Sequence, residues 1–91
     1  ALERFASKMK PQMVFLSAGF DTHWRDPVGN LGLETEDFSP LTRVVLDCAE
    51  AHANGRLVSV LEGGYDPDAL TQCVHVHLTE MLGRARQVAT P

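Results

Sequence analysis

Hydrophobic positions along the chain alternate between the spacing of a helix face and short uninterrupted apolar runs. Helical spacing occurs near residues 2–9, 41–49 and 70–82, whereas the apolar runs are 13–16 and 57–61. Apolar residues at i, i+3, i+4 and i+7 predict amphipathic helices, and short apolar runs between turn residues predict strands buried on both faces. The order helix, strand, helix, strand, helix therefore predicts an α/β fold with parallel β-strands covered by helices.

Capping and helix-stopping residues mark the predicted helix ends. They are Lys10-Pro11 after the first helix, Ser39-Pro40 at the start of the second, Asn54-Gly55 at its end and Asp66-Pro67 at the start of the third. Serine and aspartate accept hydrogen bonds from the free N–H groups of a helix start, proline fits the first turn, and glycine follows a helix end. The predicted inward stripes of the two later helices are Leu41, Val44, Val45, Cys48 and Ala49, then Leu70, Cys73, Val74, Leu78, Met81 and Leu82.

The irregular segment 20–38, between the first strand and the second helix, is rich in turn formers, and a loop of this length is usually functional. In open α/β sheets, ligands bind beyond the carboxyl ends of the strands. Asp21 offers a carboxylate after the first strand. Tyr65 offers a phenol after the second, next to Gly63 and Gly64, whose lack of a Cβ permits close approach of a ligand. Each signal alone is weak, but together on one edge they favour a site without naming its reaction.

Composition narrows the class of protein. The 91 residues are 44% hydrophobic and 22% charged, which is typical of one modest globular domain. The formal net charge of -4 comes without a Lys/Arg cluster, so we expect no nucleic-acid partner, although a cationic substrate is compatible with it. The apolar runs are far shorter than the ~20 residues of a membrane helix, and the first residues lack the layout of a secretory signal. We therefore expect no membrane partner and a cytoplasmic location, with Cys48 and Cys73 as isolated buried thiols.

Two parts of the sequence resemble the signatures of one known family. Residues 16–23 (LSAGFDTH) and 26–29 (DPVG) resemble the SAGFDAH and DPLG signature of class II histone deacetylases, bacterial deacetylase-like proteins and acetylpolyamine amidohydrolases. Residues 61–65 (LEGGY) are similar to the LEGGY signature of the same family, in the expected order. Thr22 stands in place of the usual Ala, and Val28 in place of the usual Leu. The resemblance covers nearly the whole chain and implies a partial arginase/deacetylase-type fold.

The resemblance also implies roles for individual residues. The Asp at the position of Asp21 is one of three protein ligands to the family's catalytic zinc. The Tyr at the position of Tyr65 donates a hydrogen bond to the substrate amide oxygen as negative charge develops there. Both roles are physically sensible, because zinc with an open position polarises a carbonyl and a placed donor stabilises the developing charge. Gly63 and Gly64 would let the tyrosine loop approach the metal, and Val28 would line the mouth of the acyl-lysine channel. The implied substrate is an acetyl amide of lysine or of a polyamine.

The remaining polar candidates have simpler interpretations. His23 lies two residues from Asp21, but the family does not use this position as a ligand, so we expect a loop or supporting role for it. His75 and His77 are two residues apart on a predicted helix, and side chains at that spacing point in different directions. Asp26 is expected to shape the Asp-Pro turn instead of binding zinc.

The family's active site also needs a tandem His-His pair and an Asp-x-His segment, and neither occurs in these 91 residues. We therefore interpret residues 1–91 as one partial domain, the C-terminal part of a deacetylase-like domain. We expect the isolated chain to bind zinc weakly or not at all and to be inactive. Open apolar surface and an unpaired strand edge favour a homo-oligomer. The main alternative is a non-catalytic oligomerising or interaction module. Nucleotide binding after residues 62–64 is a third reading, disfavoured because neither GxGxxG nor GxxxxGKS/T occurs.

Overall fold

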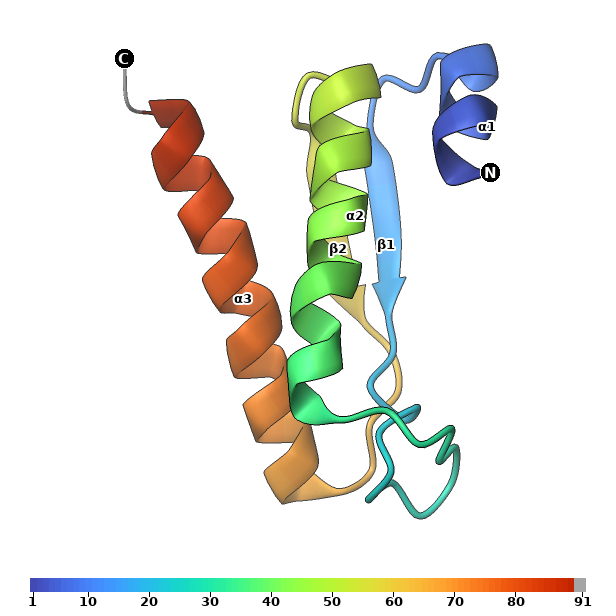
Figure 1. Ribbon diagram of the computed structural model, residues 1–91, viewed down its shortest axis with the longest axis vertical. Helices are drawn as coiled ribbons and strands as arrows, with labels where there is room; N and C mark the ends of the chain where they lie inside the picture. The colour runs from blue at the N-terminus through green and yellow to red at the C-terminus, as the bar shows by residue number, and fades with distance from the viewer. Residues whose placement is uncertain (90–91) are drawn as a thin grey trace.

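Within residues 1–89, which the computed structural model describes, two parallel strands and three α-helices follow one another in the predicted order (Figure 1). The elements are α1 (Leu2–Met9), β1 (Val14–Ala18), the 3-10 helix η1 (Thr35–Asp37), α2 (Phe38–His52), β2 (Leu57–Leu61) and α3 (Pro67–Ala89). Residues 90–91 of the predicted domain lie outside the described part. Parallel strands with helices beside them confirm the α/β fold class.

β1 and β2 are parallel, and they end opposite each other at the same edge of the sheet. Their register is Val14↔Leu57, Phe15↔Val58, Leu16↔Ser59, Ser17↔Val60 and Ala18↔Leu61. Pairing continues beyond the strands, because the N–H of Glu62 donates to the carbonyl of Ala18 at 3.0 Å and the N–H of Phe20 donates to the carbonyl of Gly63 at 2.8 Å. The two segments that follow the strands are therefore held side by side from their first residues.

One face of the β1–β2 pair is covered and the other is open. Leu16 and Ala18 pack into a core shared with α2 and α3. On the opposite face Phe15, Val58 and Val60 are 69%, 40% and 46% exposed, and we call these three residues the open sheet face. The prediction of strands buried on both faces is wrong for the residues that the structure describes. The reason is that α2 and α3 both contribute to the core on the covered side.

The core is built on Ala18, Phe20, Phe38 and Cys73, all of them buried. The rings of Phe20 and Phe38 meet edge to face with their centroids 5.2 Å apart, a favourable arrangement for an aromatic pair. Cys73 and Cys48 are both buried and free, which confirms the prediction for the two cysteines. Burial raises the pKa of the Cys73 thiol, so this group stays protonated near neutral pH.

His77 is a buried polar residue that joins α3 to two other elements. Its Nδ1 lies 2.8 Å from Oγ1 of Thr42 in α2, and its Nε2 lies 2.8 Å from Oγ of Ser59 in β2. Thr42 donates its hydroxyl hydrogen to the carbonyl of Phe38 at 2.6 Å, so it accepts from the Nδ1–H of His77, and Nε2 accepts from Ser59. Burial lowers the pKa of His77, which favours the neutral ring that these bonds require.

Ser39 does not cap α2, contrary to the prediction. The turn η1 leads directly into Phe38, and Oδ2 of Asp37 accepts a hydrogen bond from the N–H of Glu34 at 2.7 Å. Ser39 therefore lies inside the helix, where its hydroxyl donates to Glu80 of α3. The predicted cap of α3 is confirmed, since Oδ1 of Asp66 accepts from the N–H of Ala69 at 3.0 Å.

The predicted inward stripes hold only in part. Their exposed members are Leu41, Val44, Leu78 and Leu82, and the buried residues of α2 and α3 include Thr42, Leu46, Ala69 and His77 instead. Polar Thr42 and His77 can be buried because they satisfy one another, whereas apolar spacing alone cannot reveal such a pair. Ion pairs also join the two helices, with Arg84 bonded to Asp47 at 2.6 Å and to Glu50 at 2.7 Å. No helix within residues 1–89 has the length and apolar character needed to cross a membrane.

Candidate functional site

The two segments that sequence analysis singled out lie together at the carboxyl edge of the strands. Asp21 follows β1, Tyr65 follows β2, and the bond from the N–H of Phe20 to the carbonyl of Gly63 connects the segments directly. In Figure 1 both strand arrows point toward this end of the molecule, where the long loop and the start of α3 also lie. The fold thus brings a carboxylate and a phenol residue, 44 positions apart in sequence, to one edge.

The carboxylate of Asp21 is half-buried and lies against two glycines. A Cβ on Gly63 would lie 3.0 Å from Cγ and Oδ1 of Asp21, and a Cβ on Gly19 would lie 3.2 Å from the same Oδ1. Both distances are tighter than ordinary van der Waals contact. A side chain at either position would therefore push the Asp21 carboxylate from its place, and the two glycines at the strand ends form a close-fitting cradle for it.

The backbone of Asp21 is fixed by the turn that follows it in the long loop. Its carbonyl accepts a hydrogen bond from the N–H of Asn30 at 2.7 Å. Gly29 passes so close that a Cβ there would lie 2.2 Å from the same carbonyl oxygen. Any side chain at position 29 would force the backbone apart, so the turn and the Asp21 backbone can only be packed together through glycine.

Asp26 shapes this turn, as predicted. The side chain is 4% exposed, and its Oδ1 accepts hydrogen bonds from the N–H of Val28 at 2.8 Å and of Gly29 at 3.0 Å. The second oxygen has a contact that sequence analysis missed: Oδ2 accepts from the N–H of Tyr65 at 2.8 Å. One buried carboxylate therefore binds the backbone of both segments of the candidate site.

Burial alone would raise the pKa of Asp26, because it penalises the charged form. The three backbone N–H bonds, from Tyr65, Gly29 and Val28, and the nearby His23 oppose this effect and hold the pKa of Asp26 below its ordinary value. Asp26 is thus an acceptor-only anion at neutral pH, which is the form that three donors require.

Tyr65 and Val28 present their side chains outward. Tyr65 is 55% exposed and Val28 is 70% exposed, so neither side chain is buried in the core of the described residues. The preceding residue is constrained as well: Gly64 has a φ of 140°, and a Cβ there would lie 2.6 Å from Cδ1 of Leu70. Tyr65 therefore has an exposed side chain on a backbone that is restrained at its own N–H and at Gly64.

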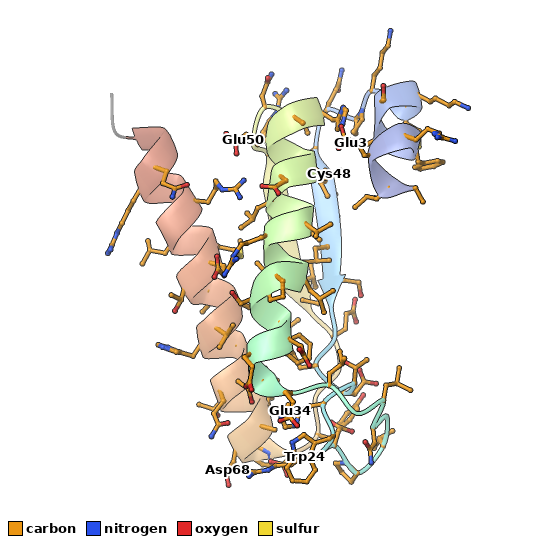
Figure 2. All side chains as sticks on the ribbon, viewed as in Figure 1. Glu3, Trp24, Glu34, Cys48, Glu50 and Asp68 are labelled. Atoms are coloured by element: carbon orange, nitrogen blue, oxygen red, sulfur yellow. The ribbon has the colours of Figure 1, made fainter. Side chains whose placement is uncertain are left out.

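His23 has the loop role that was expected. It is 2% exposed, its Nδ1 accepts from the N–H of Arg25 at 3.1 Å, and its Nε2 is left to donate to Oγ1 of Thr35 at 3.0 Å. Its ring stacks on Trp24, whose other neighbour is the Arg25 guanidinium, 5.0 Å from the ring centroid. Figure 2 shows Trp24 at the same end of the molecule as the strand tips.

A cavity of about 250 Å³ lies on the inner side of the long loop. It is lined by residues of β1, the loop and α2, most of them apolar, and by His77 of α3. The hydroxyl of Thr22 is buried and lacks a hydrogen-bond partner among the described residues. Asp21 and Tyr65 do not line this cavity, so it is separate from the predicted site.

Residues 1–89 contain no group of three or more His, Cys, Asp or Glu side chains arranged to hold a metal ion. Asp21 offers one half-buried carboxylate, which suits a single oxygen ligand. Zinc in a catalytic site normally has three protein ligands and an open position. The described residues therefore fit one part of a zinc site and do not form the whole of it.

Comparison with known proteins places these features in context. The family model described as Histone deacetylase domain matches residues 1–81. The chain is 43% identical over 76 residues to Type-2 histone deacetylase 2 of Dictyostelium discoideum, which covers 80% of the chain and 4% of that protein. It is 38% identical over 91 residues to the Histone deacetylase-like amidohydrolase of Pseudomonas aeruginosa, covering 100% of the chain and 23% of the relative.

A third relative is the Polyamine deacetylase HDAC10 of Mus musculus, 37% identical over 78 residues, which cover 86% of the chain and 11% of that protein. The chain thus spans less than a quarter of the length of each of these relatives.

Proposed function

The chain belongs to the histone deacetylase family, and from this premise we propose that it forms one side of a zinc-dependent site that hydrolyses acetyl amides of lysine or of a polyamine. The observation that carries the proposal is how closely the Asp21 carboxylate approaches Gly63, where an added Cβ would lie 3.0 Å from Cγ and Oδ1 of Asp21. The carboxylate therefore lies beside the backbone of the segment that bears Tyr65. A metal ligand and a hydrogen-bond donor for the substrate are thereby kept at one edge of the sheet, where α/β folds bind ligands.

Asp21 is the proposed zinc ligand. Its carboxylate is only half-buried and lies in the glycine cradle, so one oxygen can face the metal while the backbone stays fixed by Asn30. When bound, zinc with an open coordination position supplies Lewis-acid polarisation of the acyl carbonyl and activation of water. The chain's contribution at this point is to hold a negative oxygen in place without side-chain reorganisation.

Tyr65 is the proposed donor to the substrate. Negative charge grows on the amide oxygen as the carbonyl carbon is attacked, and a hydroxyl already in place stabilises that charge without rearranging. The exposed side chain of Tyr65 is accessible to a substrate, and its backbone is restrained by Asp26 and by the start of α3. Val28, in the turn held by the same Asp26, is the proposed wall of the channel that admits the acyl chain.

We propose that turnover requires further segments of a deacetylase domain, because the described residues provide a single zinc ligand of the three that are normally needed. This proposal is supported by the fact that the chain covers only 4% and 23% of the lengths of the Dictyostelium discoideum and Pseudomonas aeruginosa relatives. The proposal includes both acetyl-lysine and acetylpolyamines as substrates. Because the mouse relative is named a polyamine deacetylase, assays should include acetylpolyamines.

A non-catalytic interaction module is the second candidate, and the open sheet face favours it. Phe15, Val58 and Val60 form an exposed apolar surface on one side of the sheet. Contiguous apolar surface of this kind commonly marks association sites. This function would leave Asp21 and Tyr65 without effect on any activity, which separates it from the first proposal.

The test uses a chimera in which this chain replaces the matching segment of the Pseudomonas aeruginosa amidohydrolase, since the match covers the whole chain. We expect the chimera to bind zinc and hydrolyse an acetyl-lysine substrate. Asp21→Asn should lose zinc, measured as metal per protein, whereas Tyr65→Phe should keep zinc and lose about 100- to 1000-fold in turnover. Asp68→Asn, an exposed carboxylate of α3, is the matched control and should change neither quantity. Full zinc content in Asp21→Asn would refute the assignment.

A further inference from the structure

The carboxylate of Asp26 divides its two oxygens between the two segments of the candidate site. Oδ1 binds the turn of its own loop, through the N–H groups of Val28 and Gly29. Oδ2 binds the N–H of Tyr65, 39 residues away in sequence. With 4% of its surface exposed, Asp26 has little access to water that could replace a lost partner. The two segments therefore depend on one group for three backbone hydrogen bonds.

The same carboxylate also fixes Asp21, through the turn that it holds. The hydrogen bonds to Oδ1 close the turn at Gly29. The N–H of the next residue, Asn30, donates to the carbonyl of Asp21 at 2.7 Å. Gly29 itself packs on that carbonyl. We expect a change in the turn to act on the Asp21 backbone, because Asn30 is hydrogen-bonded to its carbonyl and Gly29 lies too close to that carbonyl to carry a Cβ. Asp26 is thus hydrogen-bonded directly to the backbone of Val28 and Tyr65, and it is linked to the backbone of Asp21 through the turn.

We propose that Asp26 is a positioning residue that sets the placement of Tyr65 and Val28 relative to Asp21. The functional meaning of that placement rests on the function proposed above, whereas the structural link does not. Asp26 does not itself act on zinc or substrate, since both of its oxygens are occupied by N–H donors inside the protein.

Asparagine, glutamate and alanine each fit these requirements less well. Asparagine has one acceptor and one donor group, so it can serve the turn or Tyr65 but must turn an NH₂ toward the other N–H. Glutamate keeps both acceptors but adds a methylene group in a buried site. Alanine removes all three bonds and leaves three backbone donors without a partner, which is unfavourable in buried surroundings.

The test follows individual backbone amides of the 91-residue chain by NMR. In the unsubstituted protein, the N–H signals of Tyr65, Val28 and Gly29 should shift together as the pH is lowered through one common midpoint, because all three report protonation of Asp26. In Asp26→Asn this transition should vanish from all three. Amides that move independently, or a Tyr65 amide that does not respond, would overturn the proposal, and this measurement on the unsubstituted protein needs no variant to fold.

Amide hydrogen exchange provides the second arm. In Asp26→Asn, exchange should become faster by roughly tenfold or more on one segment only, at Tyr65 or at Val28 and Gly29, because the loss of a hydrogen bond to a charged group has an effect of this size. Strand amides of β1 and β2 should keep their rates, which shows an intact fold. Equal acceleration everywhere would indicate a merely structural role and would also overturn the proposal.

These outcomes are distinct from failure of the proposed function, since neither arm needs zinc or turnover. If the amides respond as expected but Tyr65→Phe leaves the chimera fully active, the coupling by Asp26 stands and the catalytic assignment fails. If the Tyr65→Phe chimera is inactive but the Tyr65 amide signal does not respond to protonation or substitution of Asp26, the catalytic assignment stands and the positioning role is refuted.

Discussion

Replacing His77 with leucine tests how the fold that carries the candidate site is held together. His77 connects α3 to α2 and β2 through two hydroxyl groups, those of Thr42 and Ser59. Leucine has a similar size but makes neither bond, and it leaves the Ser59 hydroxyl without its acceptor. Thr42 keeps its bond to the carbonyl of Phe38, so only the imidazole bonds are removed.

Each lost hydrogen bond contributes about 1 kcal/mol net, so the free energy of unfolding at pH 7.5 should fall by roughly 2 kcal/mol. Globular domains have about 5–15 kcal/mol in total, so the variant should still fold. For a domain of this size, a loss of 2 kcal/mol corresponds to a decrease in Tm of roughly 8–16 °C. Urea unfolding followed by circular dichroism measures the change.

The pH dependence isolates His77 from the other histidines, which both proteins share. Burial lowers the pKa of His77 in the folded state, whereas the unfolded chain has the ordinary value of about 6.5. Below that pH the unfolded state binds a proton that the folded state does not. Stability should therefore be full above about pH 6.5 and fall with decreasing pH until the folded pKa is reached, at up to about 1.4 kcal/mol per pH unit.

In His77→Leu this component should be absent, so the difference between the two proteins should shrink between pH 7.5 and pH 5. Parallel pH curves for the two proteins would refute the buried neutral imidazole. A variant as stable as the unsubstituted protein at pH 7.5 would refute the two hydrogen bonds.

Three further predictions follow from local geometry. Gly63→Ala should press a Cβ onto the Asp21 carboxylate and lower the free energy of unfolding, measured in urea, by about 1–3 kcal/mol. Gly83→Ala, whose Cβ would have nothing within 4 Å, should raise it by up to about 1 kcal/mol. Equal effects of the two substitutions would contradict the close fit of Gly63 against Asp21. Thr22→Val should stabilise the chain by about 1 kcal/mol, because it removes a buried hydroxyl without a partner, and a clear loss of stability would reveal an unseen acceptor. Sedimentation should show a dimer or larger oligomer that uses the open sheet face, and a monomer at high concentration would rule this out.

The elements and their order could be predicted from sequence because local signals define them. Alternating helical and strand-like spacing, the Asp66 cap and the glycines after the strands depend on neighbours a few residues away. Parallel order then placed the segments of Asp21 and Tyr65 at one edge, since parallel strands end on the same side. The roles of these two residues came from the resemblance to the family, and they remain predictions.

What sequence could not reveal depends on distant partners. The bond from Tyr65 to Asp26 joins positions 39 apart and uses a backbone N–H, which carries no sequence signal. Thr42 and His77 are buried only because each satisfies the other, so apolar spacing pointed to exposed neighbours instead. The 3-10 turn before α2 likewise displaced the expected cap at Ser39, since its geometry follows from how the long loop packs.

The central proposal is that this chain supplies Asp21 and Tyr65 to a deacetylase site that it does not complete alone. The most direct test is turnover of a fluorogenic acetyl-lysine substrate by the purified 91-residue chain with added zinc, compared with Asp21→Ala. We expect no turnover that depends on Asp21, because a single carboxylate does not hold catalytic zinc. Robust turnover that disappears in Asp21→Ala would contradict the account, since it would mean that the chain assembles a complete site, within one copy or between copies.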